Sequence, residues 1–332
     1  MMQGERYDLA IIGAGPAGLS TAFAARQAGL SQVVLERGCV ADNIRRYPAN
    51  LVFYSTPQLI ELGDVPLIIS GQKPTRSEAL NYYTRFADLR QLNVKTYQTV
   101  VSVSRAADGF KLTTHSHVGQ VREWLAGAVV LAFGAYDDPN LLGVPGEDLP
   151  HVLHFFDEPE RYHGVDVLVV GGKGSASEAA LQIWRAGGRV SISYRRAQFS
   201  GLKYWVAPDL ENRIAEGSIK AYLPSTVTAI HPGHSQLRLA DGSHTAVPAD
   251  FVLALTGYQP RLDLFDQLQV AYHPESKRPL YDPATHQTNV EGVYVAGCLC
   301  AGNVGNEIFI ENGRAHGPLI VEHARAALIR GA

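Results

Sequence analysis

The sequence predicts an α/β fold with two parallel sheets, because one strand–turn–helix–strand unit occurs in it twice. The first copy runs from an apolar strand at 7–12, through a glycine-rich turn and a helix, to a second strand at 32–36. The second copy has its strands at 165–170 and 189–194, again joined by a glycine-rich turn and a helix. Continuous Val, Ile and Leu strands that alternate with helices are typical of parallel sheets covered on both faces.

Length and composition agree with a globular protein of two domains. The chain has 332 residues, of which 46% are hydrophobic and 18% charged, and a single hydrophobic core rarely serves so long a chain. The net charge of −3 gives no indication of a nucleic acid or an anionic membrane surface as the main partner. The longest apolar runs, such as 9–12 and 167–170, have the length of strands and not of membrane spans.

The N-terminus and the cysteines predict a cytoplasmic protein. Residues 1–8 lack the basic and apolar regions of a signal peptide and lead directly into the first strand. The cysteines are Cys39, Cys298 and Cys300. So small and odd a number fits a reducing compartment better than a disulfide-stapled secreted protein.

The second unit is inserted within the first, which predicts a discontinuous first domain. A segment with Pro and Gly at 142–147 leads into the second unit, and another at 256–260 leads out of it. We therefore expect one domain at 1–144 and 260–332 and the other at 145–259. Both are expected to be Rossmann-like dinucleotide-binding domains, because each contains a glycine turn between a strand and a helix.

The first glycine turn has the features of a phosphate-binding turn. Gly13 permits the tight turn, Gly15 lets the backbone approach a pyrophosphate, and Gly18 lets the helix pack against the strand. Glu36 follows at about the twenty-residue spacing of an acid that binds a free ribose 2′-hydroxyl, as in the ADP half of FAD. The residues expected to bind FAD here are Gly13, Gly15, Pro16, Ala17, Gly18, Glu36 and Arg37.

The second glycine turn has Lys173 at the middle position, where glycine is usual. The strand that follows it ends without an acid and continues into Arg195 and Arg196, which suit the 2′-phosphate of NADPH. The alternative interpretation is an ordinary solvated basic turn. The residues expected to bind NADPH are Gly171, Gly172, Lys173, Gly174, Ser175, Ala176, Arg195 and Arg196.

Two further segments complete the expected flavin site. The apolar strand at 129–133 leads into Gly134, and the strand at 292–296 leads into Gly297 and Cys298. Both should end at the carboxyl edge of the first sheet, where open α/β sheets bind their ligands. We therefore add Gly134, Gly297 and Cys298 to the FAD site, and we assign no metal ligand.

The order of the two units, the segment Ala-Phe-Gly-Ala-Tyr at 132–136 and the late Val-Tyr-Val-Ala-Gly at 293–297 resemble the thioredoxin-reductase-like flavoproteins. Within them, the chain is most similar to the bacillithiol disulfide reductase branch. The marks of that branch run over nearly the whole chain: Tyr47-Pro48, 53–57, 73–76, 171–176 and 309–314. The resemblance implies a homodimeric or homotetrameric enzyme that uses FAD and NADPH to reduce bacillithiol disulfide.

Three positions depart from the patterns of these families. The chain has no cysteine between Cys39 and Cys298, so it lacks the Cys-x-x-Cys of thioredoxin reductases. Ala17 stands where the bacillithiol branch often has a cysteine in the first glycine turn. Cys298 replaces the Asp that usually bonds the flavin ribityl chain. The familiar dithiol and the familiar single thiol are therefore both missing.

Cys298 and Cys300 are the candidate catalytic residues, because they lie where the last strand meets the last helix. A thiol near a helix N-terminus can have a lowered pKa and react as a thiolate. Either residue would then form a mixed disulfide or contact the reduced flavin. The alternative is that both are small buried side chains used in packing.

Further side chains are candidates for the acceptor side of the site. Tyr54 and Tyr136 either stack near the flavin or fill the core, and 203–206 is a candidate lining. His316 lies either near the flavin or on the surface of the last helix. Four basic residues form either a cationic entry for an acidic disulfide or ordinary solvated charge: Lys73, Arg76, Lys203 and Arg213.

Three functions remain open from the sequence. The first is NADPH-dependent reduction of a low-molecular-weight thiol disulfide through FAD. The second is a ferredoxin- or flavodoxin-NADP reductase of the same fold, which passes single electrons to a protein. The third is a redox-sensing protein that binds both cofactors without turnover. The first function predicts that a small disulfide stimulates NADPH oxidation, and the second predicts that ferredoxin or a one-electron dye does so. The third predicts slow or absent reduction of the flavin.

Overall fold

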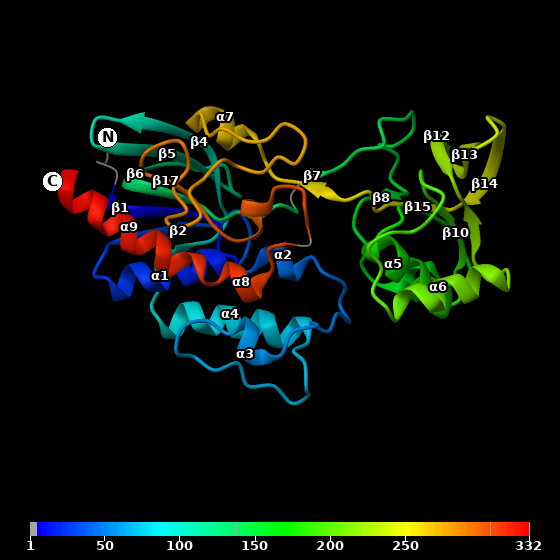
Figure 1. Cartoon of the computed structure of the whole chain (residues 1–332), viewed down its shortest axis with the longest axis horizontal. Coiled ribbons are helices and arrows are strands. Elements are labelled where there is room, and N and C mark those ends of the chain that lie inside the picture. Colours follow the sequence, from blue (N-terminus) through cyan, green and yellow to red (C-terminus); the bar gives the residue numbers. More distant parts are fainter. Residues whose placement is uncertain (1–4, 137, 306, 332) are drawn as a thin grey trace. The chain divides into compact units, whose positions relative to one another are not determined.

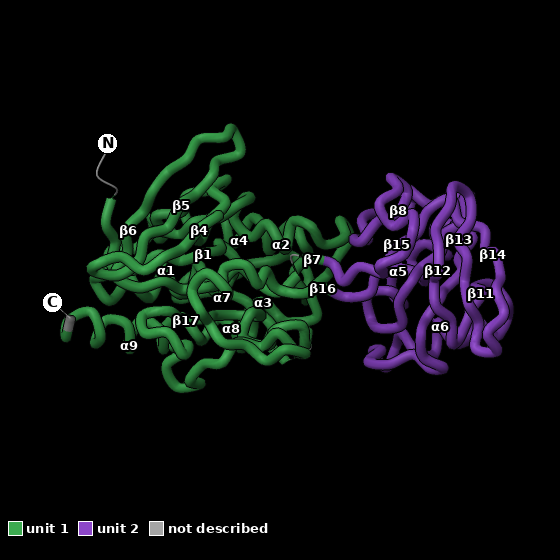
Figure 2. Tube along the Cα trace, turned by 90° about the horizontal axis from the view of Figure 1, so that it is seen from above, with its two compact units in different colours: residues 1–138, 258–332 green, residues 139–257 purple. Residues whose placement is uncertain are grey.

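The chain forms two compact units, of which unit 1 is assembled from both ends of the sequence (Figure 2). Unit 1 comprises residues 1–138 and 258–332, and unit 2 comprises residues 139–257. The structure is a computed structural model that describes residues 5–136, 138–305 and 307–331. Two short strands, β7 (Asp138–Pro139) and β16 (Tyr258–Gln259), pair where the chain passes between the units.

Unit 1 is built on a seven-stranded sheet in the order β3-β2-β1-β6-β5-β4, with β17 also paired to β6 (Figure 1). Its strands are β1 (Arg6–Ile12), β2 (Gln32–Leu35), β3 (Val94–Lys95), β4 (Gln98–Ala106), β5 (Gly109–Ser116), β6 (Val121–Leu131) and β17 (Val293–Val295). β1, β2, β3 and β17 pair in parallel, whereas β4 and β5 pair antiparallel. β6 is divided along its length: residues 121–126 pair with β5 and residues 129–131 pair with β17.

Helices cover the sheet of unit 1. They are α1 (Pro16–Gln27), α2 (Asp42–Arg45), α3 (Pro57–Ile60), α4 (Arg76–Leu89), α7 (Asp263–Leu268), η2 (Gly297–Ala301), α8 (Ile310–Gly313) and α9 (His316–Gly331). Leu9 and Ile11 of β1 face a core shared with α1, α4 and α9, which lie on the same side of the sheet (Figure 1). Ala10 and Ile12 face a second core that contains α7. This alternation is the period-two pattern of a strand buried on both faces.

Unit 2 has a five-stranded parallel sheet in the order β11-β10-β9-β15-β8, and a separate antiparallel sheet β12-β13-β14. The strands are β8 (Val152–Leu153), β9 (Asp166–Val170), β10 (Arg189–Ser193), β11 (Lys220–Tyr222), β12 (Ser225–His231), β13 (Gly233–Leu239), β14 (His244–Ala249) and β15 (Phe251–Ala254). The helices are η1 (Pro159–Tyr162), α5 (Gly174–Arg185) and α6 (Val206–Ala215). The core of the parallel sheet packs against α5 and α6.

The architecture confirms the predicted α/β fold with two Rossmann-like units. The strands expected at 7–12 and 165–170 are β1 and β9, each followed by a glycine turn and a helix. The β12–β14 sheet was not predicted, because many of its residues are polar and half-exposed and show little apolar alternation. No helix in the described part of the chain is both long and apolar enough to cross a bilayer.

Candidate active site

A pocket in unit 1 opens where four parallel strands end. Ile12, Leu35, Ala132 and Ala296, at or just beyond the ends of β1, β2, β6 and β17, line it, and it encloses about 1040 Å³, counting the part open to solvent. This edge is where open α/β sheets bind ligands. Nearly all residues expected to bind FAD line this one pocket: Gly13, Gly15, Pro16, Ala17, Glu36, Arg37, Gly134, Gly297 and Cys298.

The glycines of the first turn have three different surroundings. Gly13 has φ +109°, and a Cβ there would lie 2.6 Å from the carbonyl oxygen of Ala132. Gly18 lies behind the pocket, where a Cβ would lie 2.0 Å from the carbonyl oxygen of Gly13, so its role is helix packing. Gly15 lines the pocket and has no atom within 4 Å of a Cβ position. A ligand can therefore approach the backbone beside Gly15, at the N-terminus of α1.

Glu36 is buried immediately after β2 and holds the glycine turn. One carboxylate oxygen accepts a hydrogen bond from the Ala14 N–H at 2.7 Å, and the other accepts one from the Gly38 N–H at 2.7 Å. Burial raises the pKa of Glu36, although both N–H donors act against this shift. The carboxylate thus fixes the turn while it also lines the pocket.

Helix α2 supplies pocket residues that the sequence did not indicate. Asp42, Asn43 and Arg46 line the pocket. The Asp42 carboxylate lies 2.7 Å from Arg45 Nε and 3.2 Å from Arg46 Nε. Burial acts to raise the pKa of Asp42, but the hydrogen bond and the charges of these arginines lower it overall. The loop that carries α2 has no apolar periodicity, so only the family resemblance at Tyr47, which also lines the pocket, pointed to this segment.

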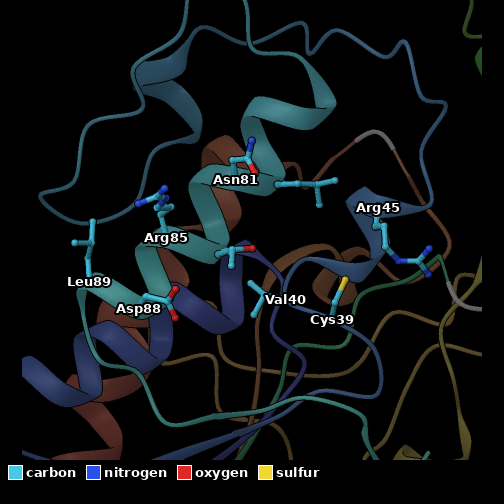
Figure 3. A pocket seen from close by; sticks show the side chains of 9 residues that line it. Cys39, Val40, Arg45, Asn81, Arg85, Asp88 and Leu89 are labelled. Atoms are coloured by element: carbon cyan, nitrogen blue, oxygen red, sulfur yellow. The ribbon is translucent and has the colours of Figure 1, made fainter.

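A second pocket of unit 1 lies between α4 and the segment that joins β2 to α2 (Figure 3). It encloses about 780 Å³, including space open to solvent, and Asn81, Arg85 and Asp88 line it from one face of α4. Cys39 lies at its other side, with Sγ 3.5 Å from Asp42 Oδ1. Burial and the neighbouring Asp42 raise the pKa of the Cys39 thiol, so this cysteine is not an activated thiolate.

The two candidate catalytic cysteines have different surroundings. Cys298 lines the pocket, and its thiol donates a hydrogen bond to the Ile308 carbonyl oxygen at 3.2 Å. Cys300 is buried, with its Sγ turned toward His286 and His316. Burial raises the pKa of Cys298 to about 11 and that of Cys300 to about 12. Of the two interpretations of these cysteines, the lowered thiol pKa is therefore contradicted for both, because desolvation is the largest cause of each shift.

His316 is a buried residue at the start of α9 and not a surface side chain. Its Nδ1 accepts a hydrogen bond from the N–H of Gly297, which lines the pocket, at 3.1 Å. Burial and the neighbouring His286 lower the pKa of His316 to about 4.

Tyr136 also lines the pocket and donates a hydrogen bond to the Gly305 carbonyl oxygen at 3.2 Å, whereas Tyr54 is half-exposed and does not line it.

The four basic residues considered for a cationic entry are divided between the two units. In unit 1, Arg76 donates a hydrogen bond to the Arg45 carbonyl oxygen at 2.8 Å. In unit 2, Lys203 pairs with Glu178 at 2.8 Å and Arg213 with Glu216 at 2.9 Å. Lys73 is exposed in the loop before α4. In the segment at 203–206, the Tyr204 and Trp205 rings are exposed and meet edge to face at 4.7 Å.

The second glycine turn lies between β9 and α5 of unit 2. Gly171 has φ +148°, and a Cβ there would lie 2.5 Å from the Leu255 carbonyl oxygen. Tyr194 follows β10 and packs its ring on Gly172, where a Cβ would lie 2.2 Å from that ring. Tyr194 stacks in turn on Phe199, with centroids 6.2 Å apart and planes at 3°. An aromatic pair therefore holds this turn.

The remaining residues expected to bind NADPH surround this turn. Lys173 is exposed and extended just before α5, and Gly174 has no atom within 4 Å of a Cβ position. Ser175 is exposed in the first turn of α5, whereas Ala176 is buried and packs at Gly171. Arg195 and Arg196 are exposed directly after Tyr194. In unit 2, the N-terminus of α5 follows β9, and the guanidinium groups of Arg195 and Arg196 come after the neighbouring strand β10. Both the helix N-terminus and the two guanidinium groups are accessible to solvent.

Comparison with known proteins places this arrangement in a family. The pyridine nucleotide-disulphide oxidoreductases match residues 10–297 of the chain. The bacilliredoxin reductase Bdr of Bacillus subtilis (strain 168) is 38% identical over 309 residues, which are 92% of this chain and 94% of that protein.

Two solved structures are similar along the whole chain. The bacillithiol disulfide reductase Bdr (YpdA) from Bacillus cereus has a TM-score of 0.94 at 34% identity and covers 97% of this chain and 100% of its own. The enzyme of the same name from Staphylococcus aureus has a TM-score of 0.90 at 33% identity, with 97% and 99% covered. These matches confirm the predicted resemblance. The chain is an enzyme of the pyridine nucleotide-disulphide oxidoreductase family and belongs to its bacillithiol disulfide reductase branch.

Proposed function

We propose that this enzyme binds FAD in unit 1 and NADPH in unit 2 and reduces bacillithiol disulfide, a low-molecular-weight thiol disulfide. One observation carries the proposal: equivalent strand ends have an acid in unit 1 and paired arginines in unit 2. An acid suits a free ribose 2′-hydroxyl, and arginines suit a 2′-phosphate. The similar enzyme from Bacillus cereus is named for bacillithiol disulfide, which supports the choice of substrate.

The pocket of unit 1 fits the adenosine and pyrophosphate half of FAD. The open space beside Gly15 admits a pyrophosphate to the N–H groups at the start of α1, where the helix dipole favours negative charge. Glu36 would accept a hydrogen bond from the ribose, and the Asp42–Arg46 pair would border the phosphates. Bound FAD would supply two-electron redox chemistry between the reduced nicotinamide and the acceptor.

We propose Cys298 as the catalytic residue of the pair. It lines the pocket, whereas Cys300 is buried against two histidines. With its raised pKa, Cys298 is a neutral thiol at pH 7 and therefore a hydrogen-bond donor rather than a nucleophile. Its S–H would donate to the thiolate that leaves when the substrate disulfide is cleaved. Cys298→Ser should then retain most activity because the hydroxyl also donates, whereas Cys298→Ala should lose roughly tenfold in kcat.

An equal effect of the two Cys298 substitutions would support a packing role instead. Inactivity of both, with flavin still bound, would indicate a nucleophilic thiol. Cys39→Ser is the matched control, because Cys39 is likewise a partly buried thiol of unit 1 but lines the separate pocket against α4. It should have wild-type activity.

An anaerobic titration of the purified protein with NADPH, followed by flavin absorbance, tests the main proposal. We expect one equivalent of NADPH to bleach the flavin band and NADH to bleach it much more slowly. Bacillithiol disulfide should then restore the band faster than ferredoxin or a one-electron dye does. A protein without flavin, or one whose flavin NADPH does not reduce, would contradict the cofactor assignment. Faster oxidation by ferredoxin would contradict the substrate.

A further inference from the structure

Three nitrogen and sulfur side chains converge in unit 1 behind the pocket that contains Cys298. Cys300 comes from η2, His316 from the first turn of α9, and His286 from the loop that precedes β17. All three are buried, with 2%, 8% and 4% of their surfaces exposed. The imidazole rings of His286 and His316 have centroids 4.0 Å apart. Packing alone rarely brings three such groups into one buried site.

The separations of their ligand atoms suit a tetrahedral metal ion. Cys300 Sγ lies 3.8 Å from His286 Nδ1 and 3.7 Å from His316 Nδ1, and one ligand atom of each residue lies within 4.8 Å of the others. In a tetrahedral zinc site, bonds of about 2.3 Å to sulfur and about 2.05 Å to nitrogen place S and N about 3.5 Å apart. Each of the two sulfur–nitrogen separations therefore exceeds the tetrahedral value by only a few tenths of an ångström.

The donor set indicates which metal fits. One thiolate with two imidazoles is a soft to borderline set, which binds zinc well and calcium or magnesium poorly. Zinc binds imidazole through an unprotonated ring nitrogen. The Tyr281 ring stacks on His286, with ring centroids 5.3 Å apart.

We propose that Cys300, His286 and His316 bind one Zn²⁺ ion in unit 1. On binding, the Cys300 thiol releases its proton to solvent and the thiolate sulfur bonds the metal, with no change of oxidation state. The Zn²⁺ ion together with one thiolate and two neutral imidazoles has a net charge of about +1. The Asp282 carboxylate near His286 partly offsets this charge.

Zinc at this site also affects the neighbouring pocket. His316 Nδ1 accepts the Gly297 N–H when no metal is bound. The same nitrogen lone pair cannot hold both a metal ion and this hydrogen. Zinc binding therefore releases the N–H of Gly297, a residue that lines the pocket. A bound ion would also link η2 to α9.

Metal content and metal affinity of the full-length protein test the proposal. The protein is stripped with a chelator and titrated with Zn²⁺ against a chromophoric competitor, and native mass spectrometry counts the bound ions. We expect one Zn²⁺ per chain, with release of about one proton per ion. Cys300→Ser should weaken binding by more than about 100-fold. The matched controls Cys298→Ser and Cys39→Ser should bind Zn²⁺ as the wild type does.

If Cys300→Ser does not fold, zinc K-edge X-ray absorption of the wild-type protein tests the site instead, because it identifies the atoms bound to the ion. We expect one sulfur ligand at about 2.3 Å and the remaining ligands as nitrogen or oxygen. A wild-type protein that binds no Zn²⁺, a first shell without sulfur, or undiminished affinity in a folded Cys300→Ser variant would each overturn the site. None of these measurements depends on reduction of the flavin, so failure of the zinc site and failure of the proposed activity are distinguishable.

Discussion

The glycine turns of unit 1 and unit 2 share a backbone hydrogen bond but are held by different side chains, here called their anchors. In each, the N–H after the first strand bonds the carbonyl oxygen at the end of the second strand, from Gly13 to Leu35 and from Gly171 to Ser193, both at 2.9 Å. The first residue after the second strand contacts the turn in both units. In unit 1 it is Glu36, which bonds the Ala14 N–H, and in unit 2 it is Tyr194, which packs on Gly172.

This difference separates what the fold requires from what the ligand requires. The strand register and the first glycine are common to both turns, so they belong to the fold. The anchor differs, and with it the chemistry offered to a ribose: a carboxylate in one unit and two arginines after an aromatic ring in the other. In the proposed function, one type of backbone unit selects two different nucleotides through the residues that follow its second strand.

Substitution of the first glycine of a turn, which both units share, should have the largest effect on stability. Gly13→Ala would place a Cβ 2.6 Å from a backbone oxygen at a φ of +109°, and should destabilise unit 1 by more than about 3 kcal/mol. Gly15→Ala has open space and should change stability by less than about 0.5 kcal/mol while it weakens flavin binding. Urea unfolding of the flavin-free proteins and flavin titration measure the two effects. Equal stability of the two variants would show that the turn tolerates a side chain at Gly13.

Loss of the aromatic anchor should have the next largest effect. Tyr194→Ala removes a buried ring that packs on Gly172 and Phe199, and should destabilise unit 2 by about 3 kcal/mol. Tyr194→Phe keeps the ring and loses only the 3.3 Å contact between the Tyr194 hydroxyl and Ser200 Oγ, at a cost of less than about 1 kcal/mol. Thermal unfolding of both variants checks this order. A large loss in Tyr194→Phe would assign the anchor to the hydroxyl.

Removal of the arginines should change nucleotide choice without affecting the fold. The double substitution Arg195→Ala and Arg196→Ala should weaken NADPH binding by roughly 10- to 100-fold, because charge-assisted hydrogen bonds to a phosphate are lost. NADH binding should be nearly unchanged, since it lacks that phosphate. Arg238→Ala, another exposed arginine of unit 2, is the control. If both nucleotides lose affinity equally, the arginines do not read the 2′-phosphate.

The smallest expected effect is a pH dependence of the free energy of unfolding that comes from Glu36, the anchor of unit 1. The folded-state pKa of Glu36 is raised above its ordinary value of 4.5 by burial. The folded state therefore holds this proton more tightly, and the stabilisation is complete below pH 4.5 and is lost as pH rises through the raised pKa. Urea unfolding of the flavin-free protein should show this slope in the wild type and not in Glu36→Gln. A slope that persists in the variant would come from another group.

Much of this fold could be predicted because its signals are local in the sequence. The apolar runs, the glycines and the acid at Glu36 lie within one unit of the chain and act on their near neighbours. Gly18 and Gly15 illustrate this: the packing role of the first and the open surroundings of the second follow from their places in the turn. Whether these residues bind a nucleotide remains a prediction.

The parts that could not be predicted depend on contacts between distant segments. Asp42 and Arg46 line the pocket from a short helix without apolar periodicity. His286, Cys300 and His316 have no spacing typical of a metal motif and come from segments before and after β17. The direction of the cysteine pKa shifts also depends on burial, which the sequence position near a helix did not reveal.

The pairing of β17 with β6 has a consequence for synthesis on the ribosome. Val293–Val295 complete the sheet of unit 1, yet they are translated after all of unit 2. We expect unit 2 to fold as soon as it emerges, while the N-terminal part of unit 1 waits without its last strand and without α9. Force measurements on stalled nascent chains should show two separate folding events. In that case the N-terminal part of unit 1, although it is synthesised first, would be the last to complete its fold.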